Sequence, residues 1–300
     1  MKRFEVIVIG GSYAGMAAAM ALGRALRKVL VIDDNQPANR QTPFAHNFLT
    51  QDGSPPAELR GLAREQVSQY PSIHFHEGRA IAGNKTKNGF VIETNTGESF
   101  YAGRLVFATG IKDLFPPIEG ITECWGISVL HCPYCHGYEV AGQTTAVLGN
   151  GDAGFEFVRL LSNWTKDLTL FTNGPSALSF SQSSLLCKHS IDVVETEIDC
   201  LEHTGGKLTH VMFRDGVLQP LQVLYALLPF EQHCSIPMTL GCELTETGYL
   251  VIDATFKTTV EGVYACGDNT SRVRTLANAI AMGTTAGMML NKELVADSFS

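Results

Sequence analysis

One pattern constrains the fold more than any other feature, and it occurs twice in the chain. It consists of a β-branched apolar run, a glycine-rich turn, a helical segment with small and long apolar residues, and a second apolar run. The first copy uses residues 5–10, 14–26 and 29–33, and the second uses 144–149, 155–163 and 167–171. Each copy predicts a βαβ unit with parallel strands and a right-handed crossover. The sequence therefore predicts an α/β protein with two Rossmann-like domains.

The first glycine turn, residues 10–15, reads Gly-Gly-Ser-Tyr-Ala-Gly. Such a turn between a strand and a helix is typical of a site where a dinucleotide pyrophosphate lies at the helix N-terminus. Ser12 replaces the middle glycine and is small enough to let a phosphate approach. Asp33 follows 23 residues after Gly10, at the end of the next strand. That position suits an acid that binds a ribose hydroxyl.

The second glycine turn is a complete G-x-G-x-x-G, formed by Gly149, Gly151 and Gly154. In this copy Thr172 takes the place that Asp33 has in the first. An NADH site would carry an acid there, and an NADPH site would carry Arg or Lys nearby. Residues 172–175, Thr-Asn-Gly-Pro, provide neither. The turn is thus a possible second nucleotide site without a ribose selector, and NAD(P)H binding stays open.

Residues 131–136 read His-Cys-Pro-Tyr-Cys-His. Two thiols three residues apart can close a disulfide, and imidazoles beside them lower the pKa of the attacking thiol. The alternative is half of a zinc site, but the sequence offers no second Cys-x-x-Cys or His-x-x-x-His to complete it. We therefore expect Cys132 and Cys135 to be a redox pair and expect no metal. His136 is the candidate for proton transfer.

Charge and hydropathy exclude several classes of partner. The net charge of -8 gives no reason to expect nucleic acid or an anionic membrane. No apolar run approaches the roughly 20 residues that a transmembrane helix needs. The N-terminal apolar run is short and enters a glycine turn, so it predicts a strand and not a signal peptide. We expect a cytoplasmic location.

The order of these motifs, followed by Gly-Val-Tyr-Ala-Cys-Gly-Asp at residues 262–268, resembles the low-molecular-weight thioredoxin reductase family over essentially the whole chain. One branch of this family is more similar to two motifs of the chain, Gly-Gly-Ser-x-Ala-Gly and Cys-x-x-Cys-His-Gly-Tyr-Glu. That branch includes the gliotoxin and holomycin dithiol oxidases and reductase-like proteins that do not use NADPH. Three departures from the family fit this: His136 replaces an acid, the basic motif near Thr172 is absent, and Arg274-Thr275 replaces Arg-Gln.

The resemblance implies two three-layer ββα domains of the FAD/NAD(P)-binding type, the second inserted into the first. Residues 1–113 and 244–300 would bind FAD, and residues 114–243 would form an NAD(P)-like domain with the redox disulfide. Cys135 would face the flavin C4a, and Cys132 would exchange with substrate. The implied FAD contacts, with those of the first turn, are Gly10, Ser12, Ala14, Gly15, Asp33, Asn47, Ala108, Gly110, Gly267 and Asp268.

Three functions follow from this interpretation. In the first, FAD reduces the disulfide, which then reduces a thioredoxin-like protein or a small-molecule disulfide. The full-length architecture and the second glycine turn favour this direction. In the second, a substrate dithiol reduces the disulfide, and the electrons leave through FAD to oxygen or another acceptor. In the third, the chain is a flavin-bound redox sensor without turnover. The resemblance also implies a homodimer.

Overall fold

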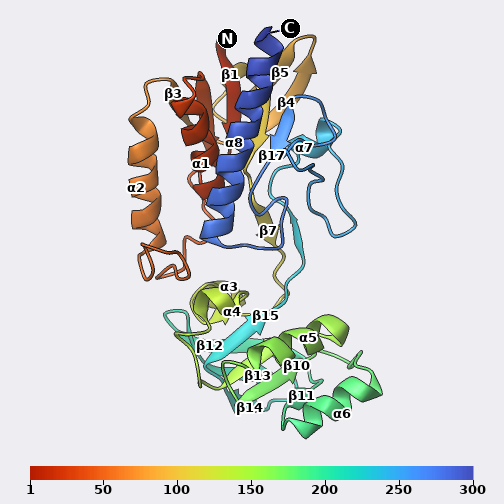
Figure 1. The fold of residues 1–300 in the computed structure, drawn as a ribbon. Coiled ribbons are helices and arrows are strands. Elements are labelled where there is room, and N and C mark those ends of the chain that lie inside the picture. The colour runs from red at the N-terminus through yellow and green to blue at the C-terminus, as the bar shows by residue number, and fades with distance from the viewer. Residues whose placement is uncertain (300) are drawn as a thin grey trace. The chain divides into compact units, whose positions relative to one another are not determined.

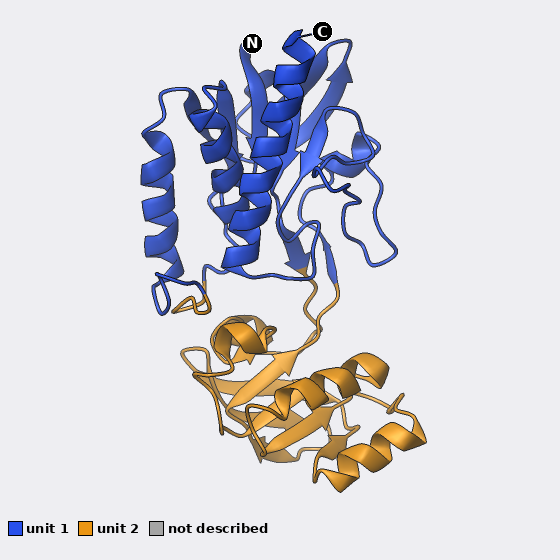
Figure 2. Cartoon of the chain, viewed as in Figure 1, with its two compact units in different colours: residues 1–40, 48–112, 230–300 blue, residues 41–47, 113–229 orange. Residues whose placement is uncertain are grey.

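The computed structural model describes residues 1–299, and these divide into two compact units (Figure 2). Unit 1 comprises residues 1–40, 48–112 and the chain from 230 onward, and unit 2 comprises residues 41–47 and 113–229. The chain crosses between units where β7 (Ile111–Asp113) pairs with β16 (Phe230–Gln232). The cofactor-domain boundaries expected at residues 113 and 244 stay a prediction.

Unit 1 is a seven-stranded sheet in the order β3-β2-β1-β6-β5-β4, with β17 also paired to β6 (Figure 1). Strands β1, β2, β3, β6 and β17 are parallel neighbours, whereas β4, β5 and β6 pair antiparallel. The strands are β1 (Lys2–Ile9), β2 (Val29–Asp33), β3 (Ile73–Glu77), β4 (Ala80–Thr86), β5 (Gly89–Thr94), β6 (Ser99–Phe107) and β17 (Val263–Ala265). The helices are α1 (Tyr13–Arg24), α2 (Pro56–Ser68), α7 (Ile236–Thr239) and α8 (Leu276–Phe299).

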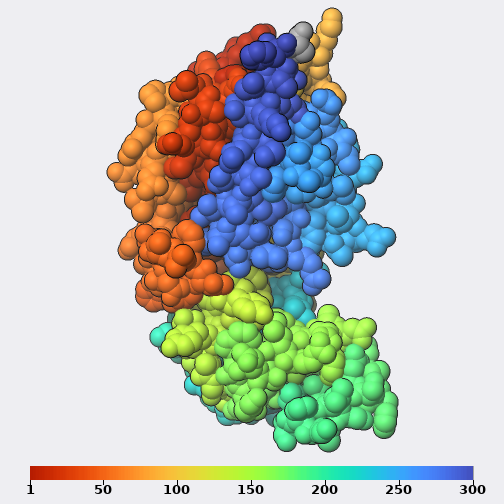
Figure 3. Space-filling view, in the orientation of Figure 1, coloured from red at the N-terminus to blue at the C-terminus, as the bar shows by residue number. Residues whose placement is uncertain are grey.

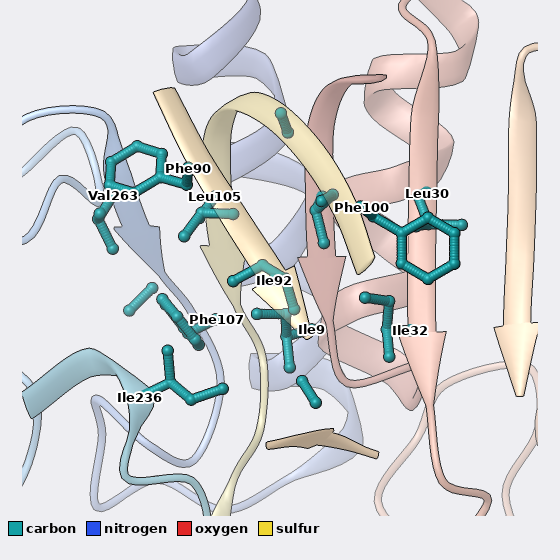
Figure 4. Packing of buried hydrophobic residues seen from close by; sticks show 14 of the residues in the cluster. Ile9, Leu30, Ile32, Phe90, Ile92, Phe100, Leu105, Phe107, Ile236 and Val263 are labelled. Carbon is teal, nitrogen blue, oxygen red and sulfur yellow. The ribbon is translucent and has the colours of Figure 1, made fainter. Parts of the chain in front are cut away.

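The first predicted βαβ unit is confirmed. β1 and β2 run parallel with Val6 opposite Val29 and Ile9 opposite Ile32. The last four residues of β1 are all buried because both faces of the sheet are covered, which explains the continuous apolar run. Alternate side chains point to opposite faces. One face packs Ile9, Ile32, Phe107 and their neighbours into the cluster that Figure 4 shows.

On the other face, α1 and α8 lie side by side (Figures 1 and 3). They approach to backbone contact because two glycines of α8 face α1. A Cβ on Gly283 would overlap the carbonyl oxygen of Ala14, and a Cβ on Gly287 would lie 2.6 Å from the carbonyl oxygen of Ala18. No helix in residues 1–299, α8 included, combines the length and the apolarity needed to cross a membrane.

Unit 2 repeats the pattern on a smaller scale. Its five-stranded sheet has the order β11-β10-β9-β15-β8, with all neighbours parallel. A three-stranded antiparallel sheet, β12-β13-β14, accompanies it. The strands are β8 (Val129–Leu130), β9 (Thr145–Leu148), β10 (Leu168–Phe171), β11 (Asp192–Val194), β12 (Ile198–Thr204), β13 (Lys207–Phe213), β14 (Leu218–Pro220) and β15 (Val223–Ala226). The helices are α3 (Ile121–Cys124), α4 (Pro133–His136), α5 (Gly151–Leu161) and α6 (Phe180–Lys188). The predicted α/β fold with two Rossmann-like domains is thus confirmed.

The packing of α1 on α8 can be tested with two helical glycines. Gly283→Ala should lower the free energy of unfolding by about 1–3 kcal/mol, because the added methyl group overlaps backbone that cannot retreat. Gly61→Ala is the control, since its Cβ would meet open space in exposed α2. It should raise the free energy of unfolding by about 0.5–1 kcal/mol. Equal midpoints for the two variants in urea denaturation would contradict this account of the packing.

Candidate functional site

The first glycine turn lies between β1 and α1 and has room for no side chain. Gly10 has φ +100°, and a Cβ there would overlap the carbonyl oxygen of Ala108. A Cβ on Gly15 would overlap the carbonyl oxygen of Gly10. The glycines therefore let α1 begin directly against the ends of β1 and β6. This is the close approach that the turn was predicted to provide.

The N-terminus of α1 is open to an anion. Ser12 is the N-cap residue, but its side chain makes no capping hydrogen bond, and the first turn carries no acidic residue. Its carbonyl oxygen accepts the first helical bond, from the N–H of Met16. Backbone N–H groups of the first turn, Ala14 included, have no intrahelical partner. A pyrophosphate at this position would receive these N–H groups and the positive end of the helix dipole.

Asp33 is fixed against this turn from two sides. Its Oδ1 accepts the N–H of Gly11 at 3.1 Å, and its Oδ2 accepts Arg60 Nη2 at 2.9 Å. A Cβ on Gly11 would lie 2.7 Å from the Cβ of Asp33, so the second glycine is also required. Each carboxylate oxygen has a second lone pair, which can accept a ribose hydroxyl. The sequence did not reveal Arg60, which reaches Asp33 from α2.

The remaining unit 1 candidates gather at the same sheet edge, because β17 runs parallel to β6 and both strands end there. Gly267 has φ +88°, and a Cβ on it would lie 2.9 Å from the Cβ of Ala14. Asp268 follows, with Oδ2 3.7 Å from Arg274 Nε. After β6, Ala108 is buried and Gly110 turns with φ +64°.

Three buried polar atoms near this edge have no hydrogen-bond partner within residues 1–299: Thr109 Oγ1, Gln232 Oε1 and Asn269 Oδ1. Their residues are otherwise held in place. Asn269 Nδ2 donates to the carbonyl oxygen of Phe107, and Gln232 Nε2 donates to that of Asn269. Buried polar atoms normally have partners. These three atoms and the open α1 turn fit a bound dinucleotide cofactor such as FAD. Thr109 belongs to the Ala-Thr-Gly strand end that the family resemblance had indicated, whereas no sequence motif had indicated Gln232 or Asn269.

Asn47, the predicted loop contact to FAD, lies in the 41–47 segment that packs within unit 2. Its backbone is left-handed, with φ +57°, which asparagine tolerates better than most residues. Its role toward the cofactor stays a prediction.

In unit 2, Cys132 and Cys135 form a disulfide with Cα atoms 5.3 Å apart. β8 leads into this motif, and α4 begins immediately after Cys132. Pro133 occupies the first helical position, where its fixed φ favours helix initiation. The N–H of Cys135 donates to the carbonyl oxygen of Cys132 at 3.2 Å. Across the described part of the chain, no three His, Cys, Asp or Glu side chains are grouped so that they could hold a metal.

Aromatic side chains support the disulfide turn on both sides. The ring of Trp125 stacks on His131 at 5.6 Å, and that of Trp164 meets Tyr134 edge-on at 5.6 Å. A Cβ on Gly137 would lie 2.7 Å from Trp164 Nε1, so the glycine lets Trp164 close on the turn. The two tryptophans had not been singled out from the sequence. They come from loops whose contact with the motif depends on the fold.

His136 is half-buried behind the disulfide. Burial lowers its pKa, Glu139 opposes this shift, and His46 adds to it. With its pKa lowered, His136 is largely neutral near pH 7. A neutral imidazole can accept a proton from a thiol, so the environment suits the proton-transfer role predicted for this residue.

The second glycine turn is capped by one of its own side chains. Asn150 Oδ1 accepts the N–H groups of Gly151 and Ala177, both at 2.8 Å, and Asn150 Nδ2 donates to the carbonyl oxygen of Pro175 at 2.9 Å. Asn150 thus caps α5 and ties the turn to the loop after β10. In α1 the equivalent N-cap side chain makes no such bond.

Charge also disfavours a pyrophosphate at this second turn. Asp152 places a carboxylate in the first turn of α5, where Gln182 Nε2 donates to it at 2.7 Å. Gly149 and Gly154 pack backbone to backbone as Gly10 and Gly15 do, so the glycines do not distinguish the two turns. Thr172 is buried and its Oγ1 donates to the carbonyl oxygen of Gly174 at 2.7 Å.

A hollow of about 380 Å³ lies beside the second turn, and none of the described residues that line it is charged. It is lined by Leu114, Phe115, Pro116, Leu148, Gly149, Asn150, Thr172, Asn173, Leu227, Leu228 and Pro229. An NADPH 2′-phosphate would find no Arg or Lys there. The second turn thus has complete glycine spacing but no cation for a 2′-phosphate beside it, and NAD(P)H binding stays open.

Residues 4–283 match the family model described as pyridine nucleotide-disulphide oxidoreductase. A thioredoxin reductase, tcpT, of Claviceps purpurea is 30% identical over 98% of this chain and 95% of its own length. An oxidoreductase of Agrobacterium tumefaciens shares 35% identity with a TM-score of 0.91, covering 99% of both chains. A putative thioredoxin reductase, TrxB, of Bacillus anthracis shares 31% identity with a TM-score of 0.94, covering 99% of this chain and 100% of its own.

The first turn can be tested through flavin content. Asp33→Ala should weaken FAD binding by about 10- to 100-fold, because it removes a charge-assisted hydrogen bond to the turn and a ribose acceptor. Asp34→Ala is the matched control, since the Asp34 carboxylate accepts a hydrogen bond from the N–H of nearby Gln36 and from no residue of the turn within residues 1–299. The measurement is the visible absorbance per protein after gel filtration, followed by FAD titration. Wild-type affinity in the Asp33 variant would refute the assignment.

Proposed function

Because the chain belongs to the pyridine nucleotide-disulphide oxidoreductase family, we propose that its Cys132–Cys135 disulfide takes electrons from a substrate dithiol and passes them to FAD. The chain is a thioredoxin reductase-like flavoprotein disulfide oxidoreductase, and FAD is its cofactor. The direction of electron flow, from the dithiol to FAD, is our proposal.

One observation carries this direction: Asn150 occupies the second glycine turn with its own side chain. A reductase that runs on NAD(P)H needs that turn for the nucleotide that supplies its electrons. Asp152 and the uncharged hollow beside the turn support the same conclusion. Without a nicotinamide donor, the reducing equivalents must come from a dithiol.

The sulfur chemistry is a two-electron exchange. A substrate thiolate attacks Cys132 Sγ, which forms a mixed disulfide and releases Cys135 as a thiolate. The second substrate thiol attacks the mixed disulfide, so the substrate leaves as a disulfide and Cys132 is released. His136 accepts a proton from an attacking thiol. Cys132 and Cys135 then form their disulfide again with loss of two electrons, for which bound FAD would be the acceptor.

Unit 1 provides the residues that would hold the cofactor. The open N-terminus of α1 receives the pyrophosphate, and Asp33 binds a ribose hydroxyl. Gly267 and Asp268, at the end of β17, bind the ribityl and pyrophosphate region by the family resemblance. Bound FAD would supply the two-electron chemistry that links the disulfide to oxygen or to another acceptor.

The opposite direction, reduction of a thioredoxin-like protein or a small-molecule disulfide, remains the second candidate. The names of the relatives, thioredoxin reductase tcpT and putative thioredoxin reductase TrxB, favour it. A flavin-bound sensor without turnover is the third, and the intact disulfide argues against it. The sequence-based expectations of a homodimer and a cytoplasmic location belong to this proposal, and light scattering and fractionation test them.

The role of Cys135 can be tested with one substitution. Cys135→Ser should keep FAD bound but lose anaerobic bleaching of the flavin by dithiothreitol, because the thiol that passes electrons to the cofactor is gone. Cys187→Ser is the control, since Cys187 is an exposed free cysteine in α6. Bleaching of the Cys135 variant at the wild-type rate would remove this residue from the mechanism.

The direction can be tested by titrating the wild-type protein anaerobically with NADPH, NADH and dithiothreitol in separate experiments. We expect dithiothreitol to bleach the flavin band within the time of mixing and manual recording. The two nucleotides should bleach it slowly or not at all, because Asn150 caps the second turn with its own side chain. Rapid bleaching by a low micromolar nucleotide in a stopped-flow instrument would instead establish the reductase direction.

A further inference from the structure

A short excursion of the chain between β2 and α2 packs within unit 2. Gln41 Nε2 donates to the carbonyl oxygen of Thr122 at 3.0 Å. Thr42 Oγ1 lies 2.8 Å from the position that a Cβ on Gly126 would take, where φ is +76°. These contacts anchor the start of the excursion and bring His46, near its end, to the disulfide motif.

His46 meets an acid that follows the motif. Its Nδ1 lies 3.4 Å from Glu139 Oε1, and the two side chains are 19% and 37% exposed. Glu139 comes three residues after His136. The chain there still turns helically, since the N–H of Val140 donates to the carbonyl oxygen of His136 at 3.3 Å. Residues three apart on such a turn are neighbours, and Glu139 lies close enough to raise the pKa of His136.

We propose, on the basis of the function proposed above, that Glu139 is a positioning residue for proton transfer at the Cys132–Cys135 disulfide and that His46 holds it in place. Glu139 stabilises the imidazolium that His136 becomes when it accepts a proton. It contacts neither the substrate nor the reacting sulfur atoms, and acts through His136. Neither Glu139 nor His46 was a candidate from the sequence.

The step balances without a further reactant. A substrate thiol gives its proton to His136 as its sulfur forms a bond to Cys132 Sγ. The Cys132–Cys135 bond breaks, and the electron pair stays on Cys135 as a thiolate. His136 then returns the proton to water. The disulfide is reduced by the two electrons that the substrate loses, and Glu139 keeps its negative charge throughout.

The need for Glu139 follows from burial. A half-buried imidazolium is costly unless an opposite charge lies close, which is why burial lowers the pKa of His136. Glu139 raises that pKa and His46 lowers it, and these are the two charged groups that shift the pKa of His136. A carboxylate therefore favours the charged state that forms during the transfer.

The test compares Glu139→Gln with Glu156→Gln, which makes the same charge change in an exposed residue of α5 that pairs with Arg159. The rate of anaerobic flavin reduction by dithiothreitol is measured in both holoenzymes across pH. Below the pKa of the dithiothreitol thiols, the Glu139 variant should be about 10-fold slower, a fraction of the usual effect of a general base. Above that pKa the substrate arrives as a thiolate, and the two rates should converge. Glu139→Asp, which keeps the charge, should recover part of the loss.

His46→Asn, with His189→Asn at the exposed end of α6 as control, tests the second contact. The His46 variant should be slower than its control below the thiol pKa. It should cause no further slowing in the Glu139→Gln background, because the slowing acts through the Glu139 carboxylate that His46 holds. A deficit that is equal at every pH, or full additivity of the two changes, would overturn the proposal.

The wild-type protein distinguishes a failure of the proposed electron flow from a failure of the role proposed for Glu139. If dithiothreitol does not bleach the wild-type flavin, the proposed direction of electron flow fails. If the wild type bleaches and the Glu139 and Glu156 variants behave alike, only the role of Glu139 fails. Flavin content and circular dichroism of each variant show that the fold is retained.

Discussion

The structure of unit 1 depends on backbone-to-backbone contact at α1. A Cβ on Gly15 would overlap the carbonyl oxygen of Gly10, just after β1. A Cβ on Gly283 would overlap the carbonyl oxygen of Ala14 in α1. The absence of these side chains lets α1 sit tightly between the sheet and α8. Its first N–H groups are then held at the edge where β1, β6 and β17 end. In the proposed site this fixed array would bind the pyrophosphate of the cofactor, so the helix packing would set the position of that group.

The two glycine turns differ in what satisfies the N–H groups at the start of the helix that follows each of them. Every helix leaves N–H groups unpaired at its start, and either a side chain or a ligand must satisfy them. In α1 the N-cap serine leaves them to a ligand, whereas in α5 Asn150 satisfies one of them internally. A capped helix start gains stability and loses its affinity for anions. This difference between two side chains bears directly on which reductant the protein can use.

The disulfide motif depends on groups that lie far from it in the sequence. Trp164 supports the turn through Tyr134, and His46 reaches Glu139 from a loop that begins beyond β2. A redox disulfide needs both a held geometry and a route for protons, and here different parts of the chain provide the two.

The sequence by itself determined the α/β class, the two βαβ units and the Cys132–Cys135 pair. Each of these depends on residues close together in the chain, where a period of apolar residues or a fixed spacing reveals the structure. Only the tertiary structure showed that Asn150 caps the second turn, that Arg60 holds Asp33, and that His46 meets Glu139. The complete glycine spacing of the second turn did not by itself decide whether a second nucleotide fits there. Its fit is decided by which polar side chain lies over the helix start and by what lines the hollow beside it. Such contacts are set by side-chain direction and by packing between distant segments, and neither leaves a periodic signal in the sequence.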